Sequence, residues 1–319
     1  MANPRIERQL VASGFNTQRR ILLRRMWNDR LLYLLLVPLF LFYLIFHYAP
    51  MYGVLVAFQD YNMFRGIVGS EWVGLENFRR IFSTSDFFTV LRNTLMLNGL
   101  HLIVGFPAPI ILALLLNEVG HSGFKRLIQT IAYLPHFLSW VIVASLVITL
   151  LSPSTGIVNA TIRSLGGEPI HFMANEVWWV AVYVGSGIWK EVGWSTIIYL
   201  AALTGIDPNL YEAARIDGAS RWRQTVHITL PGIAPTIIVL LLLNLGRIMA
   251  VGFDQPFLLG NSAVIGVSDV ISTYVYRIGL LSADIARSAA VGLFQSLVNF
   301  FTLILANYLS KKVTEEGIF

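Results

Sequence analysis

The sequence of 319 residues contains no cysteine and few charged residues. The lack of cysteine excludes disulfide frameworks, thiolate metal sites, redox pairs and cysteine nucleophiles. Only 13% of the residues are charged and 55% are hydrophobic, whereas soluble chains carry roughly 25% charged residues. Because so few polar side chains cannot cover soluble domains of this size, the composition predicts a membrane protein.

The chain carries an excess of positive charge, with a formal net charge of +5. Seven arginines lie within residues 1–30, directly ahead of an apolar run. This placement is typical of a cytoplasmic membrane flank and not of a nucleic-acid-binding face, so we expect no nucleic-acid partner. Residues 19–27 read RRILLRRMW, with apolar residues at helical spacing. This pattern fits either an interfacial amphipathic helix or a disordered basic tail.

Apolar stretches long enough to cross a bilayer as helices occur six times along the chain. They are Leu31–Tyr48, Val90–Asn117, Leu127–Leu151, Val177–Leu203, Ile233–Val251 and Ser288–Leu309. No small-residue cleavage site follows the first stretch, so we expect it to remain as a helix. The sequence therefore predicts an all-α membrane protein with six transmembrane helices over residues 31–309, between a basic segment 1–30 and a tail 310–319.

The distribution of lysine and arginine predicts the orientation of these helices. With the N-terminus placed inside, the inner segments hold 14 of the 23 lysines and arginines and the outer segments hold 6. By the positive-inside rule both termini lie in the cytoplasm, and the outer connections are about residues 50–89, 152–176 and 252–287. No histidine pair with metal-ligand spacing and no nucleophilic serine motif occurs, so we expect neither a metal site nor an enzyme active site.

The connection between the fourth and fifth stretches, residues 205–231, has the signals of a short helix. Asp207 can cap a helix start with its carboxylate, and Pro208 suits the first helical position. Gly218 suits the left-handed turn that ends a helix. These residues alone fit either a lever that projects from the membrane domain or an ordinary loop helix.

The same connection resembles the EAA loop of permease subunits in binding-protein-dependent ABC importers. It matches the pattern EAA-x3-G-x9-I-x-LP at every position, from Glu212 through Gly218 to Pro231. The resemblance extends over about residues 30–310. Stretches that look like the sugar-importer branch are Asn93–Leu95, Tyr133–His136 and Phe253–Asp254. Val267–Tyr276 looks more like the permeases for polysaccharide-derived and uronate oligosaccharides, alginate among them, than like the maltose type.

The resemblance implies the type I permease fold of ABC importers in the bacterial cytoplasmic membrane. It implies a heterodimer with a second homologous permease, two ATPase subunits and an extracytoplasmic solute-binding protein. The chain has no GxxxxGK[ST] loop and no Gly-Lys dipeptide, so we expect ATP and Mg on the partner ATPases and no cofactor here. The resemblance makes the segment a coupling helix, with these expected ATPase contacts: Tyr211, Glu212, Ala213, Ala214, Asp217 and Gly218.

Ionisable residues within the predicted spans mark the expected solute path. Lys190 and Glu191 lie in the fourth span and Arg247 in the fifth, and charged groups in a membrane usually face the bundle interior or an aqueous cavity. Lys190 shares a predicted helix face with Trp194, as Asn244 does with Arg247. A cation beside an aromatic ring and an amide suits sugar recognition.

By resemblance to the maltose-type permease, the sugar-facing positions are Gly187, Lys190, Glu191, Trp194, Asn244, Arg247, Ile248 and Val251. Lys190 and Arg247 stand at positions that are uncharged in the maltose type. One hypothesis is that both cations receive carboxylates of an acidic oligosaccharide. The alternative is that Lys190 pairs with Glu191 or another buried acid, and that Arg247 neutralises a charge of a partner subunit. An autonomous secondary transporter or channel, in which these groups serve ion coupling, remains the rival function.

Overall fold

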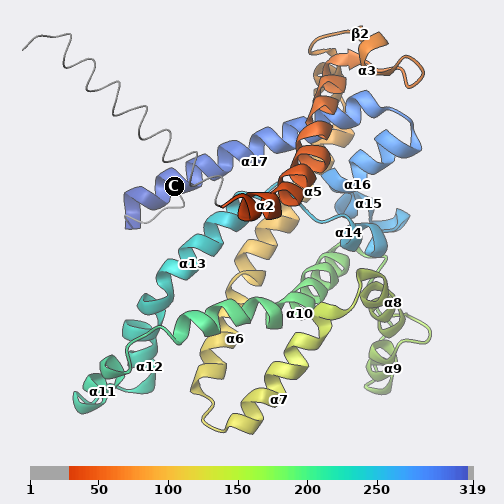
Figure 1. The fold of residues 1–319 in the computed structure, drawn as a ribbon. Helices are drawn as coiled ribbons and strands as arrows, with labels where there is room; N and C mark the ends of the chain where they lie inside the picture. The colour runs from red at the N-terminus through yellow and green to blue at the C-terminus, as the bar shows by residue number, and fades with distance from the viewer. Residues whose placement is uncertain (1–28, 315–319) are drawn as a thin grey trace, which may run out of the picture. The chain divides into compact units, whose positions relative to one another are not determined.

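The computed structural model describes residues 29–314 and consists mostly of helices (Figure 1). The chain divides into two units, Met1–Leu55 and Val56–Phe319, and each is described by itself. The predicted interfacial helix at residues 19–27 lies outside the described residues. The elements, in which η marks 3-10 and π-helical turns, are α2 (Arg30–Tyr43), η1 (Leu44–Tyr48), η2 (Ala49–Phe58), β1 (Gln59–Asp60), α3 (Gly66–Gly69), β2 (Glu71–Trp72), α4 (Glu76–Phe82), α5 (Ser85–Leu100), η3 (His101–Gly105), α6 (Pro107–Glu118), α7 (Ser122–Tyr133), η4 (Leu134–Phe137), α8 (Trp140–Leu150), α9 (Ile157–Ser164), α10 (Glu176–Leu203), α11 (Pro208–Ile216), α12 (Arg221–Gln224), η5 (Thr225–Thr229), α13 (Leu230–Leu245), α14 (Asp254–Leu259), η6 (Ser262–Val264), α15 (Ile265–Ser268), α16 (Ile271–Tyr276), η7 (Arg277–Leu281) and α17 (Ile285–Thr314).

Four described helices are long and apolar enough to cross a membrane. They are Arg30–Phe58, Ser85–Glu118, Arg221–Leu245 and Ile285–Lys312. Two further helix pairs meet the same test only together and are sharply bent, by 104° between Ser122–Phe137 and Trp140–Leu150 and by 118° between Ser262–Ser268 and Ile271–Leu281. The described part of the chain thus offers four to six candidate spans by length and composition, and the arrangement of six spans stays a prediction.

The third predicted span, Leu127–Leu151, is wrong as a single straight helix. Helix α7 ends at Tyr133, and α8 begins at Trp140 in a different direction. Pro135 lies in the 3-10 turn between them, where it lacks an amide hydrogen for a continuous helix. The stretch Tyr133–His136, which resembles the sugar-importer branch, therefore lies at this bend.

The fifth predicted span, Ile233–Val251, extends too far toward its C-terminal end. Helix α13 ends at Leu245. Arg247 lies beyond it in a turn, where its backbone N–H donates to the carbonyl of Asn244 at 3.0 Å. Asp254, in another stretch that resembles the sugar-importer branch, is the first residue of the separate helix α14. Arg247 is therefore not a charged residue within a membrane helix.

The fourth predicted span coincides with α10, which lies at the centre of the second unit. Helix α10 packs against α6, α7, α13 and η4. Lys190 and Glu191 lie near its middle and lower its hydropathy, so α10 is absent from the apolar helices named above. A Cβ atom on Gly193 would overlap the carbonyl of Ala132 in α7. Glycine at this position therefore lets two helix backbones meet.

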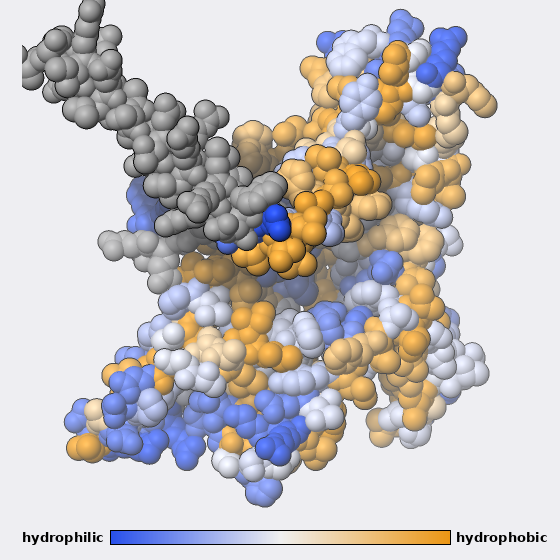
Figure 2. Space-filling view, in the orientation of Figure 1, coloured by the Kyte–Doolittle hydropathy of each residue, from blue (hydrophilic) through white to orange (hydrophobic). Residues whose placement is uncertain are grey.

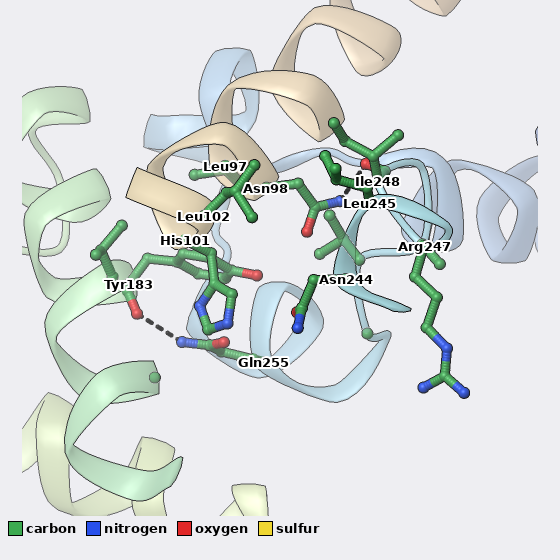
Figure 3. A pocket seen from close by; sticks show the side chains of 15 residues that line it. Leu97, Asn98, His101, Leu102, Tyr183, Asn244, Leu245, Arg247, Ile248 and Gln255 are labelled. Atoms are coloured by element: carbon green, nitrogen blue, oxygen red, sulfur yellow. Dashed lines mark hydrogen bonds between the residues drawn. The ribbon is translucent and has the colours of Figure 1, made fainter. Parts of the chain in front are cut away.

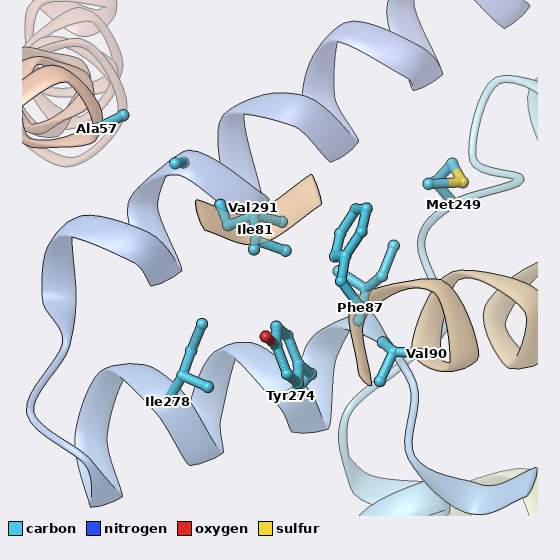
Figure 4. Close-up of a cluster of buried hydrophobic side chains, with 10 residues drawn as sticks. Ala57, Ile81, Phe87, Val90, Met249, Tyr274, Ile278 and Val291 are labelled. Atoms are coloured by element: carbon cyan, nitrogen blue, oxygen red, sulfur yellow. The ribbon is translucent and has the colours of Figure 1, made fainter. Parts of the chain in front are cut away.

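A buried apolar cluster joins α5, α16 and α17 (Figure 4). Phe87, Tyr274 and Val291 supply side chains from the three helices.

Polar groups hold the second bent pair against α5 as well. The buried amide of Asn93 donates to two backbone carbonyls of the pair at 3.0 Å each, and the hydroxyl of Thr94 accepts a hydrogen bond from the first amide of α16 at 3.0 Å. The bend is thus fixed from outside by contacts distant in sequence.

The second unit also carries a small two-stranded sheet, in which β1 pairs antiparallel with β2. Gln59 lies opposite Trp72 and Asp60 lies opposite Glu71. The sheet and α3 lie at one end of the unit, whereas α11 lies at the opposite end (Figure 1).

Candidate functional site

A cavity of about 240 Å³ lies between α5, α10 and the segment that follows α13 (Figure 3). Four side chains bring amide or imidazole groups to its wall: Asn98, His101, Asn244 and Gln255. Figure 3 shows His101, Asn244 and Gln255 around the same space, although they come from three separate segments. Neutral groups that both donate and accept hydrogen bonds suit the hydroxyl groups of a sugar.

Contacts with distant backbone groups fix two of the three amides of this wall. Gln255 Nε2 donates to the carbonyl of Tyr183 at 2.7 Å, and Asn98 Nδ2 donates to the carbonyl of Ile248 at 2.6 Å. A Cβ atom on Gly187 would lie 3.4 Å from the Gln255 amide. The Gln255 amide therefore lies within van der Waals contact of α10 at Gly187.

A π-helical turn places His101 on the wall. The backbone N–H of Phe106 donates to the carbonyl of His101 at 2.8 Å, which closes a wider turn than that of an α-helix. Pro107 follows directly and has no amide hydrogen to offer the preceding turn. Single π-turns within helices are frequent at functional sites.

A second cavity of about 220 Å³ adjoins the first, because His101 and Asn244 line both. Glu191 of α10 contributes a carboxylate to this second cavity. Among the described residues that line the two cavities, Glu191 is the sole acid and Arg247 the sole lysine or arginine. The two opposite charges therefore belong to different cavities.

Arg247 lies at the edge of the first cavity and is exposed. Its guanidinium points away from His101 and Gln255 in Figure 3. It makes no hydrogen bond or ion pair with another side chain among the described residues. An exposed guanidinium of this kind is free to bind an anion.

Lys190 has a different environment, since only 5% of the residue is exposed. Its ammonium donates to the carbonyl of His136 at 2.8 Å and lies 3.4 Å from Glu191 Oε1. It also lies 5.7 Å from the ring centroid of Trp140. The second oxygen of Glu191 lies 2.8 Å from His136 Nδ1. The geometry thus favours the pairing of Lys190 with Glu191 over direct contact with a solute.

Trp194 is not the aromatic partner of Lys190, although the two share a predicted helix face. Its ring stacks on the imidazole of His136, with centroids 4.5 Å apart and planes at 1°. Phe137 meets the same ring edge-on at 5.8 Å. Trp194 therefore packs against the bend between α7 and α8.

The helix predicted within residues 205–231 is confirmed as α11. The Asp207 carboxylate accepts a hydrogen bond from the backbone N–H of Asn209 at 2.9 Å, and Pro208 is the first helical residue. Gly218 has a φ of +73°, the left-handed conformation that favours glycine after a helix end. The Tyr211 hydroxyl lies 3.0 Å from the hydroxyl of Thr229, which ties α11 to the start of the next long helix.

Helix α11 presents a polar surface at one end of the unit. Figure 2 shows hydrophilic residues gathered at the lower left, over α11 and α12. Of the predicted ATPase contacts, Tyr211 and Ala214 are half-buried, and the exposed ones are Glu212, Ala213, Asp217 and Gly218. Arg221 of α12 forms an ion pair at 2.8 Å with Glu118 at the end of α6. The EAA residues are therefore accessible on a projecting segment.

Residues 105–315 match the family described as the binding-protein-dependent transport system inner membrane component. The chain belongs to this family. The permease is 49% identical over 302 residues to the polygalacturonan/rhamnogalacturonan transport system permease protein YteP of Bacillus subtilis strain 168, with 95% of this chain and 94% of that protein covered. Members of the family are transport permease subunits of the inner membrane and not enzymes themselves.

The permease is also similar to two solved structures. One is a bacterial ABC transporter involved in the import of the acidic polysaccharide alginate, with a TM-score of 0.86, 44% identity, and 92% of this chain and 99% of that chain covered. The other is a bacterial alginate ABC transporter in complex with alginate pentasaccharide-bound periplasmic protein, with a TM-score of 0.86, 43% identity and the same coverage. The predicted all-α permease fold of ABC importers is confirmed.

Five of the eight predicted solute-facing positions of the permease line the first cavity: Gly187, Asn244, Arg247, Ile248 and Val251. Glu191 lines the second cavity. Lys190 and Trp194 are not among the residues that line either. The structure thus brings most of the predicted set together, and their roles in transport stay predictions.

Sequence reasoning missed His101, Asn98 and Gln255 as cavity residues. The first two are polar side chains within the second apolar stretch. Because polar groups are costly to place in a membrane, their presence there is a signal that could have indicated a functional site. Gln255 lies in an expected outer connection, where glutamine is unremarkable. Its position beside α10 depends on contacts between residues 72 positions apart.

Proposed function

We propose that this permease forms one half of a translocation pathway for acidic, uronate-containing oligosaccharides. The observation that carries the proposal is the first cavity, which has neutral hydrogen-bonding groups on its wall and, at its edge, Arg247 with an exposed guanidinium directed away from His101 and Gln255. Amides and an imidazole suit sugar hydroxyls, and a guanidinium suits a carboxylate because it offers two parallel hydrogen bonds. The cavity can thus distinguish a uronate from the corresponding neutral sugar.

The relatives support an acidic cargo. The similar permease is named for polygalacturonan and rhamnogalacturonan, and the similar structures belong to importers of the acidic polysaccharide alginate. Identities of 43–49% over nearly the whole chain support the proposal that this chain transports a related class of cargo.

The proposed importer needs partners. A second homologous permease completes the pathway as a heterodimer, two ATPase subunits supply ATP hydrolysis with Mg, and a solute-binding protein delivers the oligosaccharide from outside. The accessible EAA residues of α11 support contact with an ATPase, with Glu212 and Gly218 as the main candidates. The proposal places the permease in the bacterial cytoplasmic membrane with both termini in the cytoplasm.

The test is uptake by the assembled importer in proteoliposomes, with oligogalacturonates and neutral galacto-oligosaccharides of equal length. Arg247→Ala should lower oligogalacturonate uptake about tenfold or more, since hydrogen bonds to charged groups contribute about 1.5–3 kcal/mol. Uptake of the neutral cargo should change much less. Arg247→Lys should retain part of the acidic uptake, because lysine keeps the charge but loses the two-pronged geometry.

Arg126→Ala is the matched control, because Arg126 is also an exposed arginine and lines neither cavity. Equal uptake of oligogalacturonate by the wild-type importer and Arg247→Ala would contradict the role of Arg247. The chain reconstituted without its partners should be inert. Uptake down an ion gradient by the isolated chain would instead support the rival secondary transporter.

A further inference from the structure

Glu191 presents a difficulty for an anionic cargo. Its carboxylate lines the second cavity, which shares His101 and Asn244 with the first. A solute that moves from one cavity to the other would therefore pass a negative group. Charges interact more strongly in a protein interior than in water, so an uncompensated carboxylate would oppose a uronate there.

The environment of Glu191 provides compensation from behind the cavity wall. Lys190 Nζ lies 3.4 Å from one carboxylate oxygen, and His136 Nδ1 lies 2.8 Å from the other. The lysine side chain is only 7% exposed, whereas that of Glu191 is 39% exposed. The acid thus faces the cavity, and its counter-charge does not.

The position of the Lys190 ammonium is fixed by two further contacts. It donates to the carbonyl of His136 at 2.8 Å, in the turn between α7 and α8. Since Trp140 also lies beside it at 5.7 Å, the ammonium is held on the far side of Glu191 and cannot reach a solute without leaving three contacts. A direct solute contact and a counter-charge role are therefore distinct.

We propose that Lys190 is a positioning residue whose charge offsets that of Glu191, so that the second cavity admits an acidic oligosaccharide. The inference rests on the proposed function. With its charge offset, the Glu191 carboxylate can still accept hydrogen bonds from sugar hydroxyls of either cargo. Lys190 thereby sets specificity through Glu191 and not through contact with the solute.

The test compares Lys190→Met, Glu191→Gln and the double variant in the assembled importer, with oligogalacturonates and neutral galacto-oligosaccharides of equal length. Lys190→Met should lower oligogalacturonate uptake about tenfold or more and neutral uptake less than about threefold, because it leaves the negative charge of Glu191 without a counter-charge. The double variant should recover acidic uptake to within about threefold of wild type, since it also replaces the Glu191 carboxylate by a neutral amide. Lys190→Arg should keep the preference for acidic cargo.

A different result is expected if Lys190 only stabilises the bend between α7 and α8 through its hydrogen bond to His136. Uptake of both cargoes would then fall together, and Glu191→Gln would not restore it in the double variant, because the bond to His136 stays lost. That result overturns the inference while the wild-type importer still takes up oligogalacturonate. A wild-type importer that takes up only the neutral cargo overturns the proposed function and, with it, this inference.

Arg287→Met provides the control for the loss of an ion pair as such. Arg287 pairs with Asp284 at 2.6 Å, is about one-third exposed and lines neither cavity. Its loss should not change the ratio of acidic to neutral uptake. Thermal unfolding of each purified complex separates a loss of fold from a change in specificity.

Discussion

Helix α11 and the first cavity are built from contacts of very different range. The limits of α11 depend on neighbours in sequence, since Asp207 caps an amide two positions away and Gly218 turns the chain directly after the helix. The cavity wall depends on a bond from Asn98 to the carbonyl of Ile248, 150 positions away. Local contacts therefore set the limits of the helix proposed to contact an ATPase, whereas the proposed solute site depends on contacts between segments distant in sequence.

The largest effect is expected where the cavity scaffold itself is broken. In Gly193→Val, the new Cβ would overlap the carbonyl of Ala132, and a backbone atom cannot move aside as a side chain can. We expect a loss of about 3 kcal/mol or more in the free energy of unfolding, at the upper end for overpacked sites. Yield and thermal unfolding of the purified complex measure it.

Gly185→Val is the matched control for Gly193, in the same helix. Apart from its chain neighbours and the backbone of its own helix, a Cβ atom at Gly185 would meet no atom within 4 Å. This variant should assemble and unfold like the wild type. Equal stability of both variants would show that α10 and α7 do not depend on this close approach.

A smaller effect, confined to function, is expected on α11. Glu212 is exposed, so Glu212→Ala should leave thermal unfolding unchanged. If Glu212 anchors an ATPase, uptake of both cargoes should fall about tenfold, as for a central interface residue whose truncation costs more than about 1 kcal/mol. Glu168→Ala, an exposed acid of another connection, serves as the control. A cargo-selective loss in Glu212→Ala would contradict a coupling role.

The smallest effect is expected from the cap of the same helix. Asp207→Ala removes the acceptor of the Asn209 amide, and loss of such a cap costs typically about 1 kcal/mol. Uptake should fall severalfold, because α11 is then less completely formed. Asp207→Ser keeps a capping oxygen and should behave almost like the wild type. If Asp207→Ala lowers the thermal stability of the complex as much as Gly193→Val does, the role of Asp207 is not limited to local capping of α11.

The same contrast of range explains which features could be predicted from the sequence. The start and the end of α11 could be predicted from residues 205–231, because capping and proline signals act over a few positions. The bend at Pro135 and the end of α13 before Arg247 were missed, since hydropathy continues across both. Apolar side chains suit a straight helix and a bent one alike, so composition does not distinguish them.

For the cavity, most of the positions predicted by resemblance do line the wall, and the pairing of Lys190 with Glu191 is one of the two alternatives that the sequence leaves open. The hypothesis of an acidic solute gives Lys190 and Arg247 the same role, whereas the alternative gives them different ones. The structure buries Lys190 among Glu191, His136 and Trp140 and leaves Arg247 exposed beyond the end of α13. Sequence spacing along α10 gives a shared face for Lys190 and Trp194, but it does not indicate which neighbouring helix that face meets.

The sequence by itself determined that this chain enters a membrane, carries a capped EAA helix and has the fold of an ABC importer permease. Composition and short-range backbone preferences are sufficient for the first two features, and the motif for the third. Only the tertiary structure decided that His101, Asn244 and Gln255 surround one space and that Lys190 lies behind Glu191. Those arrangements arise from the packing of helices distant in sequence, which no local pattern encodes.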